Sequence, residues 1–169
     1  MKKLLILALA CAAASSAFAL EPKTTVAIAH AEGGYDHKNV AVTVIVNPAE
    51  RGRMWLTANS SYQLLFSERD ELLDLIRTAA GKIEIAVANR TTISYRRPVG
   101  FFTTDDAALV IVSFMTDGYE ASYTVVQFTA YGNNDILLLN KKDTQDFIDI
   151  LGKSHAFVDD YQRQAALFR

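Results

Sequence analysis

The chain has 169 residues and a formal net charge of −2, from 17 lysines and arginines and 19 aspartates and glutamates. This weakly acidic balance argues against non-specific binding to nucleic acid or anionic lipid, because such binding needs clustered cations. The single cysteine, Cys11, lies near the N-terminus, so the remainder offers no thiol nucleophile, disulfide or thiolate ligand for zinc.

Residues 1–19, MKKLLILALACAAASSAFA, have the features of a bacterial secretory signal peptide. Two lysines precede a short apolar run, and Ala-Phe-Ala at 17–19 supplies the small residues that signal peptidase requires. The run is shorter than the roughly 20 residues that span a bilayer. We expect cleavage after residue 19 and a periplasmic or secreted single domain over residues 20–169, with no later transmembrane segment. Lipidation at Cys11 is the alternative, although the preceding residues match a lipoprotein box poorly.

In the first half, period-two β-branched segments predict strands, and a change of period then predicts a helix. The predicted strands are residues 25–30, 40–46, 54–58 and 62–66. A polar cap at 67–70 precedes apolar residues at helical spacing over 72–79. Gly81 is expected to end this helix, and residues 83–88 are expected to return to strand.

The second half shows a similar order of elements. The predicted strands are residues 108–115, 123–131 and 136–139, of which the first two form a hairpin. Asn140 or Asp143 can cap a following helix that Gly152 would end, and a last amphipathic helix is expected over residues 154–168.

These elements predict an α+β fold, with a mainly antiparallel sheet and two or three helices packed on one face. The segments ELLDLI, from Glu71, and DFIDIL, from Asp146, are 75 residues apart and follow similar strand and cap patterns. One explanation is two pseudo-symmetric strand-strand-strand-helix halves related by a pseudo-twofold, with a groove or homodimer surface between them. The other is that any strand-cap-helix unit converges on this pattern.

The stretch HAEGGYDHKN, residues 30–39, raises the question of a metal site. If the even-numbered valines of residues 40–46 face the same side as Ile28, Glu32 pairs with Asp36 and His37 faces away from His30. A polar hairpin tip then explains the stretch. A site made of His30, Glu32 and Asp36 stays open as the alternative, although no recognised metal-ligand spacing is present.

Signatures of catalysis and cofactor binding are weak. The chain has no Gly-x-Ser-x-Gly elbow, and the Gly-Lys-Ser at residues 152–154 lacks the preceding glycine and the strand of a phosphate-binding loop. No cofactor is therefore predicted.

Basic and aromatic residues gather in two segments that would form one binding surface if their strands paired. Arginine, tyrosine and tryptophan combine large contact area with directional donors, which suits recognition of a partner. Charge and proline at a sheet edge also prevent sheet-to-sheet association, which is the more common explanation, and Pro98 either ends its strand or places it at an edge. The candidate binding residues are Arg53, Trp55, Tyr95, Arg96 and Arg97.

The sequence thus favours an exported, non-enzymatic domain that binds an envelope protein or a small ligand. The alternative is a small metal-dependent or hydrolytic enzyme using His30, Glu32 and Asp36. A subunit of a symmetric oligomer is a third hypothesis.

Overall fold

The computed structural model describes residues 24–33, 39–46, 52–58, 60–130 and 132–167. The first half contains β1 (Thr24–Gly33), β2 (Asn39–Val46), β3 (Arg53–Thr57), β4 (Ser61–Leu65) and α2 (Phe66–Ala88). The second half contains β5 (Ser94–Thr103), β6 (Leu109–Asp117), β7 (Ser122–Ala130), β8 (Asn133–Leu139) and α3 (Lys141–Ala166). The predicted α+β class is confirmed. The signal peptide predicted at residues 1–19 lies outside the described residues.

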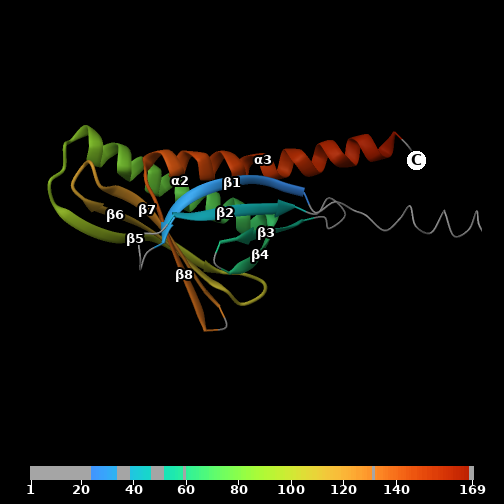
Figure 1. Cartoon of the computed structure of the whole chain (residues 1–169), viewed down its shortest axis with the longest axis horizontal. Coiled ribbons are helices and arrows are strands. Elements are labelled where there is room, and N and C mark those ends of the chain that lie inside the picture. Colours follow the sequence, from blue (N-terminus) through green and yellow to red (C-terminus); the bar gives the residue numbers. More distant parts are fainter. Residues whose placement is uncertain (1–23, 34–38, 47–51, 59, 131, 168–169) are drawn as a thin grey trace, which may run out of the picture.

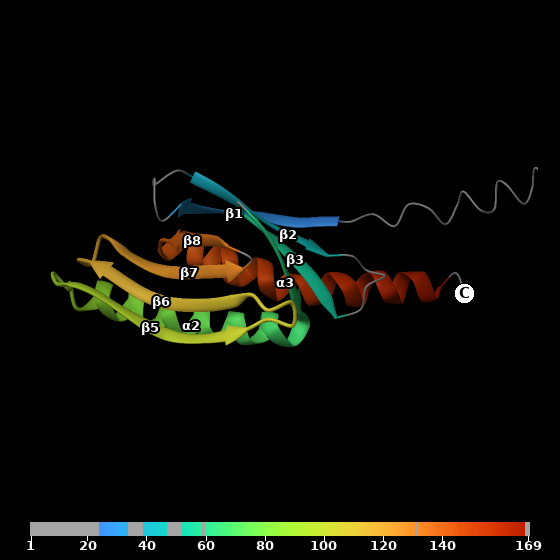
Figure 2. The same ribbon diagram turned by 90° about the horizontal axis from the view of Figure 1, so that it is seen from below.

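The strands form an eight-stranded sheet in the order β4-β3-β2-β1-β8-β7-β6-β5, and the registers between neighbouring strands are antiparallel. β4 and β5 are therefore the two edge strands. The two long helices lie along the sheet, α2 against β4 to β7 and α3 against β1, β2, β7 and β8 (Figures 1 and 2). In the described part of the chain, no helix is both long and apolar enough to span a membrane.

Each half consists of four strands and a helix rather than the predicted three strands and a helix. The helices begin at Phe66 and Lys141, 75 residues apart, and the buried pairs Leu72/Phe147 and Ile76/Leu151 keep the same spacing. The four strands of each half follow the same order along the sheet. The halves therefore repeat the same order of strands and helix, and the pseudo-twofold relation between them stays a prediction.

Both helices continue through the glycines that were expected to end them. α2 passes Gly81 and includes residues 83–88, which were predicted to be a strand, and α3 joins the two helices predicted around Gly152. Burial explains the continuation of α2, because Ile83 and Ala86 extend the buried stripe at helical spacing.

Two side chains organise the helix starts. Asn140 Oδ1 accepts a hydrogen bond from the Asp143 amide at 2.9 Å, so Asn140, one of the two predicted caps, caps α3. At α2, Glu68 accepts from the Leu65 amide at 2.7 Å and from the Asp105 amide at 2.6 Å. Glu68 therefore joins the start of α2 to the loop after β5.

β1 and β2 pair as predicted, but their register differs. Glu32 pairs with Asn39 and Ile28 with Thr43, and a register shift lies between Thr25 and Ala27. The predicted pairing of Glu32 with Asp36 is therefore wrong. With this register, the β2 valines at 40, 42 and 44 stand opposite the β1 alanines at 31, 29 and 27.

The sheet curves so strongly that strands distant in its order are in contact. Tyr62 of β4 stacks on Phe128 of β7 with ring centroids 4.6 Å apart, although four strands lie between them in the sheet order. Asp135, at the start of β8, accepts hydrogen bonds from the Ser60 amide at 2.8 Å and the Tyr62 hydroxyl at 3.0 Å. The curvature encloses one main core drawn from β3 to β8 and both helices.

Candidate functional site

The predicted basic and aromatic surface is divided in the structure. Trp55 and Arg53 lie on β3, which pairs with β2 and β4, whereas β5 carries Tyr95 and pairs with β6. Five strands separate β3 from β5 in the sheet order, so the condition for one joint surface, pairing of the two segments, is not met. Arg53 instead forms an ion pair with Asp105 at 3.7 Å in the loop after β5.

Arg96 and Arg97 face opposite sides of β5, because successive residues of a strand alternate. Arg97 pairs in register with Phe114, which packs against α2 residues, and Tyr95 pairs with the buried Thr116. Tyr95 and Arg97 therefore face the helix side of the sheet. Arg96 pairs with Met115 and faces the other side.

Tyr95 and Arg97 contribute to a groove between the C-terminal part of α2 and edge strand β5. This α2–β5 groove has a volume of about 260 Å³. Its apolar floor includes the buried Phe114, whose ring centroid lies 6.5 Å from that of Tyr95. The residues that define the groove here are Lys82, Ile85, Ile93, Tyr95, Arg97 and Phe114.

The groove exposes large apolar side chains. Ile85 is 63% exposed, Ile93 62% and Tyr95 42%. Single exposed apolar residues are ordinary, but a contiguous group beside a hollow is typical of an interaction site.

Two cations line this apolar group, and neither forms an ion pair with a described carboxylate. In the described chain, six basic side chains form ion pairs with carboxylates, and none of the six lines the groove. Of the five other described basic residues, four lie on the distal part of α2, the following turn or β5. These four are Lys82, Arg90, Arg96 and Arg97. Of these four, Lys82 and Arg97 line the groove, which is therefore apolar in its centre with two cations in its lining.

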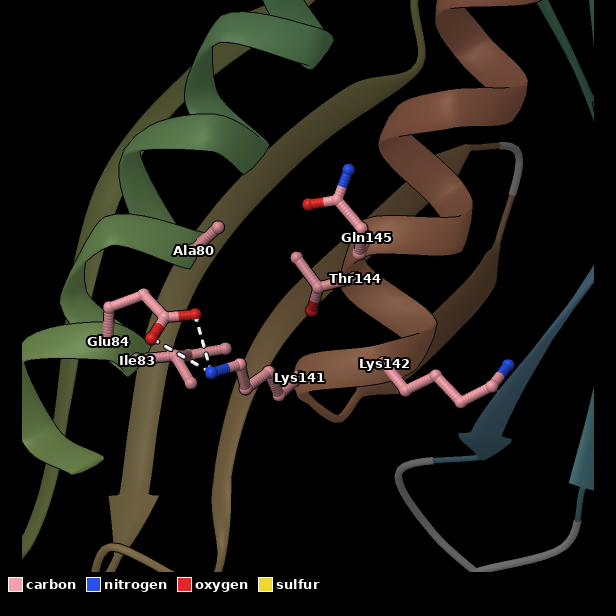
Figure 3. A pocket seen from close by; sticks show the side chains of 7 residues that line it. All are labelled: Ala80, Ile83, Glu84, Lys141, Lys142, Thr144 and Gln145. Atoms are coloured by element: carbon pink, nitrogen blue, oxygen red, sulfur yellow. Dashed lines mark hydrogen bonds and ion pairs between the residues drawn. The ribbon is translucent and has the colours of Figure 1, made fainter.

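A second hollow, of about 350 Å³, lies between α2 and the start of α3 (Figure 3). The Lys141 amino group contacts both carboxylate oxygens of Glu84, at 2.8 and 2.9 Å, and Lys142 points away from that pair. The other polar lining groups also have partners within the protein: Thr144 with Leu139 O, Gln145 with Asp149 and Lys142 with Asp146. These pairings indicate that the polar side chains stabilise the packing of the helices rather than form a group of catalytic residues.

The structure offers little support for acid-base chemistry at its buried polar pair. Burial, and to a lesser degree Asp135, raise the pKa of Tyr62 to about 12, despite an opposing Ser60 interaction. The phenol therefore stays protonated at neutral pH and serves as a donor to Asp135. Tyr62 is 2% exposed, so this pair has a structural role between the halves.

The alternative metal site is only partly described. His30 and Glu32 lie in β1, and Asp36 and His37 lie outside the described residues. The prediction that His30 and His37 face opposite sides assumed that Glu32 pairs with Asp36. This pairing is wrong, because Glu32 pairs with Asn39. Within the described residues, no group of three or more histidines, cysteines and carboxylates is arranged to hold a metal. The site of His30, Glu32 and Asp36 stays a prediction.

Sequence reasoning missed the α2 side of the groove. Ile85 belongs to a segment that was interpreted as a strand, so its position three residues after Lys82 on one helix face was not considered. The usable signal was the helical repeat of Ile76, Ala79 and Ile83, which continues beyond Gly81.

Comparison of the chain with protein-family models, curated proteins and solved structures finds no match to any of them.

Proposed function

We propose that the protein is an exported, non-enzymatic interaction domain and that it binds a partner protein of the cell envelope through the α2–β5 groove. The N-terminal sequence supports export, through its basic start, short apolar run and small residues at 17–19. The groove supports binding, and the observation that carries the proposal is the exposed Ile85, Ile93 and Tyr95 beside cations without ion pairs among the described residues.

The composition of the groove fits partner recognition better than it fits catalysis. Protein interfaces favour an apolar, aromatic centre with arginine and a polar rim. A catalytic site would need a nucleophile or base held within reach of its partner groups. The groove is lined by two cations, two threonines and apolar or aromatic residues, which supply contact area and charge.

Site-specific photocrosslinking tests the proposal in the exported full chain. A benzoylphenylalanine placed at Ile93, which is exposed at the groove, should form an adduct with another polypeptide in the bacterial envelope. The Arg97→Glu substitution should reduce that adduct severalfold, because it reverses a charge in the groove. Immunoblotting and mass spectrometry of the adduct provide the measurement.

The matched control places the same photoreactive residue at Asp149, which is exposed on α3 outside the groove. This position should give no comparable adduct. Equal adducts from both positions, or no adduct from position 93, would contradict the proposed surface.

A further inference from the structure

Building on the proposed function, we infer that the groove receives an extended segment of the partner, carrying acidic and apolar side chains, which adds to the sheet as a ninth strand beside β5. Three observations point to this ligand: the open strand edge, the contiguity of this edge with the groove, and the two cations in the groove lining.

The first observation is the exposed edge of β5. β5 pairs with β6 on one side and is the last strand in the sheet order. Residues 94–98 at its start are all exposed. An edge strand presents backbone N–H and C=O groups that can pair with an added strand, and main-chain hydrogen bonds then supply affinity.

The second observation is that the edge and the groove are contiguous. Tyr95 and Arg97 belong to the edge strand and also line the groove, which α2 borders with Lys82 and Ile85. Every second side chain of an added strand would point to the same side of the sheet. Those side chains would enter the groove, while its backbone paired with β5.

The third observation is charge, which selects the kind of segment. Lys82 and Arg97 line the groove and have no ion pair among the described residues. Carboxylates on the groove side of an added strand would supply the missing partners. Pairing of two β5 strands from two copies would instead bring arginines together at 96 and 97, and such like-charge contacts disfavour a second copy of this chain as the ligand.

Pro98 limits the length over which the added strand can pair with β5. Proline has no backbone N–H, and the register of β5 with β6 shifts between Pro98 and Gly100. The added strand should therefore pair with residues 94–97 and not continue along β5. Side chains in the groove must then supply the specificity that a short ladder lacks.

A synthetic peptide about eight residues long, a usual strand length, provides the probe. Its sequence Ile-Thr-Glu-Thr-Ile-Thr-Glu-Thr presents isoleucine and glutamate on one face and threonine on the other. Fluorescence anisotropy of the labelled peptide should show saturable binding to the mature protein. Hydrogen exchange of the amides at residues 94–97 should slow in the complex.

Two variants with the same change of charge form the matched comparison. Arg97→Glu should weaken the peptide about tenfold, whereas Arg96→Glu should have a smaller effect, because Arg96 faces the opposite side of β5. Circular dichroism of both variants checks that each retains the native fold. Equal effects of the two substitutions would overturn the assignment to the groove face.

Modified peptides separate the inference from the proposed function. A peptide N-methylated along its backbone should not bind, and one with lysine in place of glutamate should bind at least about tenfold more weakly. Full binding by the methylated peptide would overturn strand addition, and full binding by the lysine peptide would overturn the charge selection. Neither result would affect a photocrosslink at position 93, which tests the groove itself.

Vesicles of phosphatidylcholine with phosphatidylglycerol form the last arm, because cations around an apolar patch also suit anionic lipid. The protein should not sediment with them. Sedimentation with these vesicles together with no binding of the acidic peptide would overturn the inference in favour of a membrane surface.

Discussion

Tyr62 and Asp135 show at the scale of single residues how the two halves of the chain depend on each other. The Tyr62 ring stacks on Phe128, and its hydroxyl donates to Asp135, which also accepts from the Ser60 amide. A buried carboxylate is costly unless it is hydrogen-bonded, so each half supplies a group that the other requires. The residue contacts thus hold the strongly curved sheet in its shape.

This pair predicts a loss of stability at high pH. The pKa of Tyr62 is raised to about 12, mainly by burial, from the ordinary value of 10.0 expected in the unfolded chain. The stabilisation is therefore fully present below pH 10 and is lost as the pH rises towards 12, by at most about 3 kcal/mol. Urea unfolding of the native protein and of Tyr62→Phe across this range should measure it.

The Tyr62→Phe variant is itself the control, because lysines and the other tyrosines titrate in both proteins. Near neutral pH it should be less stable by about 1–2 kcal/mol, since Asp135 loses a donor. This difference should shrink as the pH rises above 10. A constant difference between the two proteins would contradict the assigned pKa.

At the scale of elements, the glycines inside the two long helices are weak points rather than ends. Gly81 and Gly152 lie within α2 and α3, both are exposed, and a Cβ added at either would meet no atom within 4 Å. Alanine is favoured over glycine inside a helix. Gly81→Ala and Gly152→Ala should each raise the free energy of unfolding by about 0.5–1 kcal/mol, measured by urea denaturation.

Gly52→Ala should have the opposite effect on stability to the two helix substitutions. Gly52 has φ of +88°, and its carbonyl accepts a hydrogen bond from the Phe66 amide at 2.8 Å. A side chain is strained at this φ, so the substitution should destabilise the protein although no atom crowds the new Cβ. Stabilisation by Gly52→Ala, or destabilisation by Gly81→Ala, would contradict this account of the glycines.

The elements differ in how well the sequence predicts them. Strands such as β6 and β7 were predicted because their alternation is local, and their hairpin is confirmed. The end of α2 was not predicted, because Gly81 is a common helix-ending residue. Only the burial of Ile83 and Ala86 explains why the helix continues beyond it. The register of β1 with β2 depends on an irregularity between Thr25 and Ala27, which alternation alone does not reveal.

The candidate site was only partly predictable for a related reason. Tyr95 and Arg97 were identified from their residue types, and their alternation with Arg96 follows from strand geometry. Their separation from Trp55 depends on the sheet order, which results from long-range pairing of β1 with β8. Local patterns do not determine that pairing.

At the scale of the whole molecule, each helix packs on strands from both halves. α2 belongs to the first half but contacts β5, β6 and β7, and α3 belongs to the second half but contacts β1 and β2. Arg69 of α2 is buried and donates to Ser154 Oγ of α3 at 3.1 Å, which adds a polar contact between the helices. The structural repeat is therefore not a pair of independent modules.

This interlocking predicts that neither half folds alone. A fragment of residues 20–90 would expose the face of α2 that packs on β5, β6 and β7, and a fragment of residues 91–169 would lose the helix that covers those strands. The intact mature chain should unfold in one cooperative transition, because its main core includes residues from both halves. Circular dichroism during heating should show that transition for residues 20–169 and no cooperative transition for either fragment. A fragment that melts cooperatively as a monomer would show that one strand-and-helix unit is self-sufficient, and its partner unit would then add to a formed domain rather than complete it.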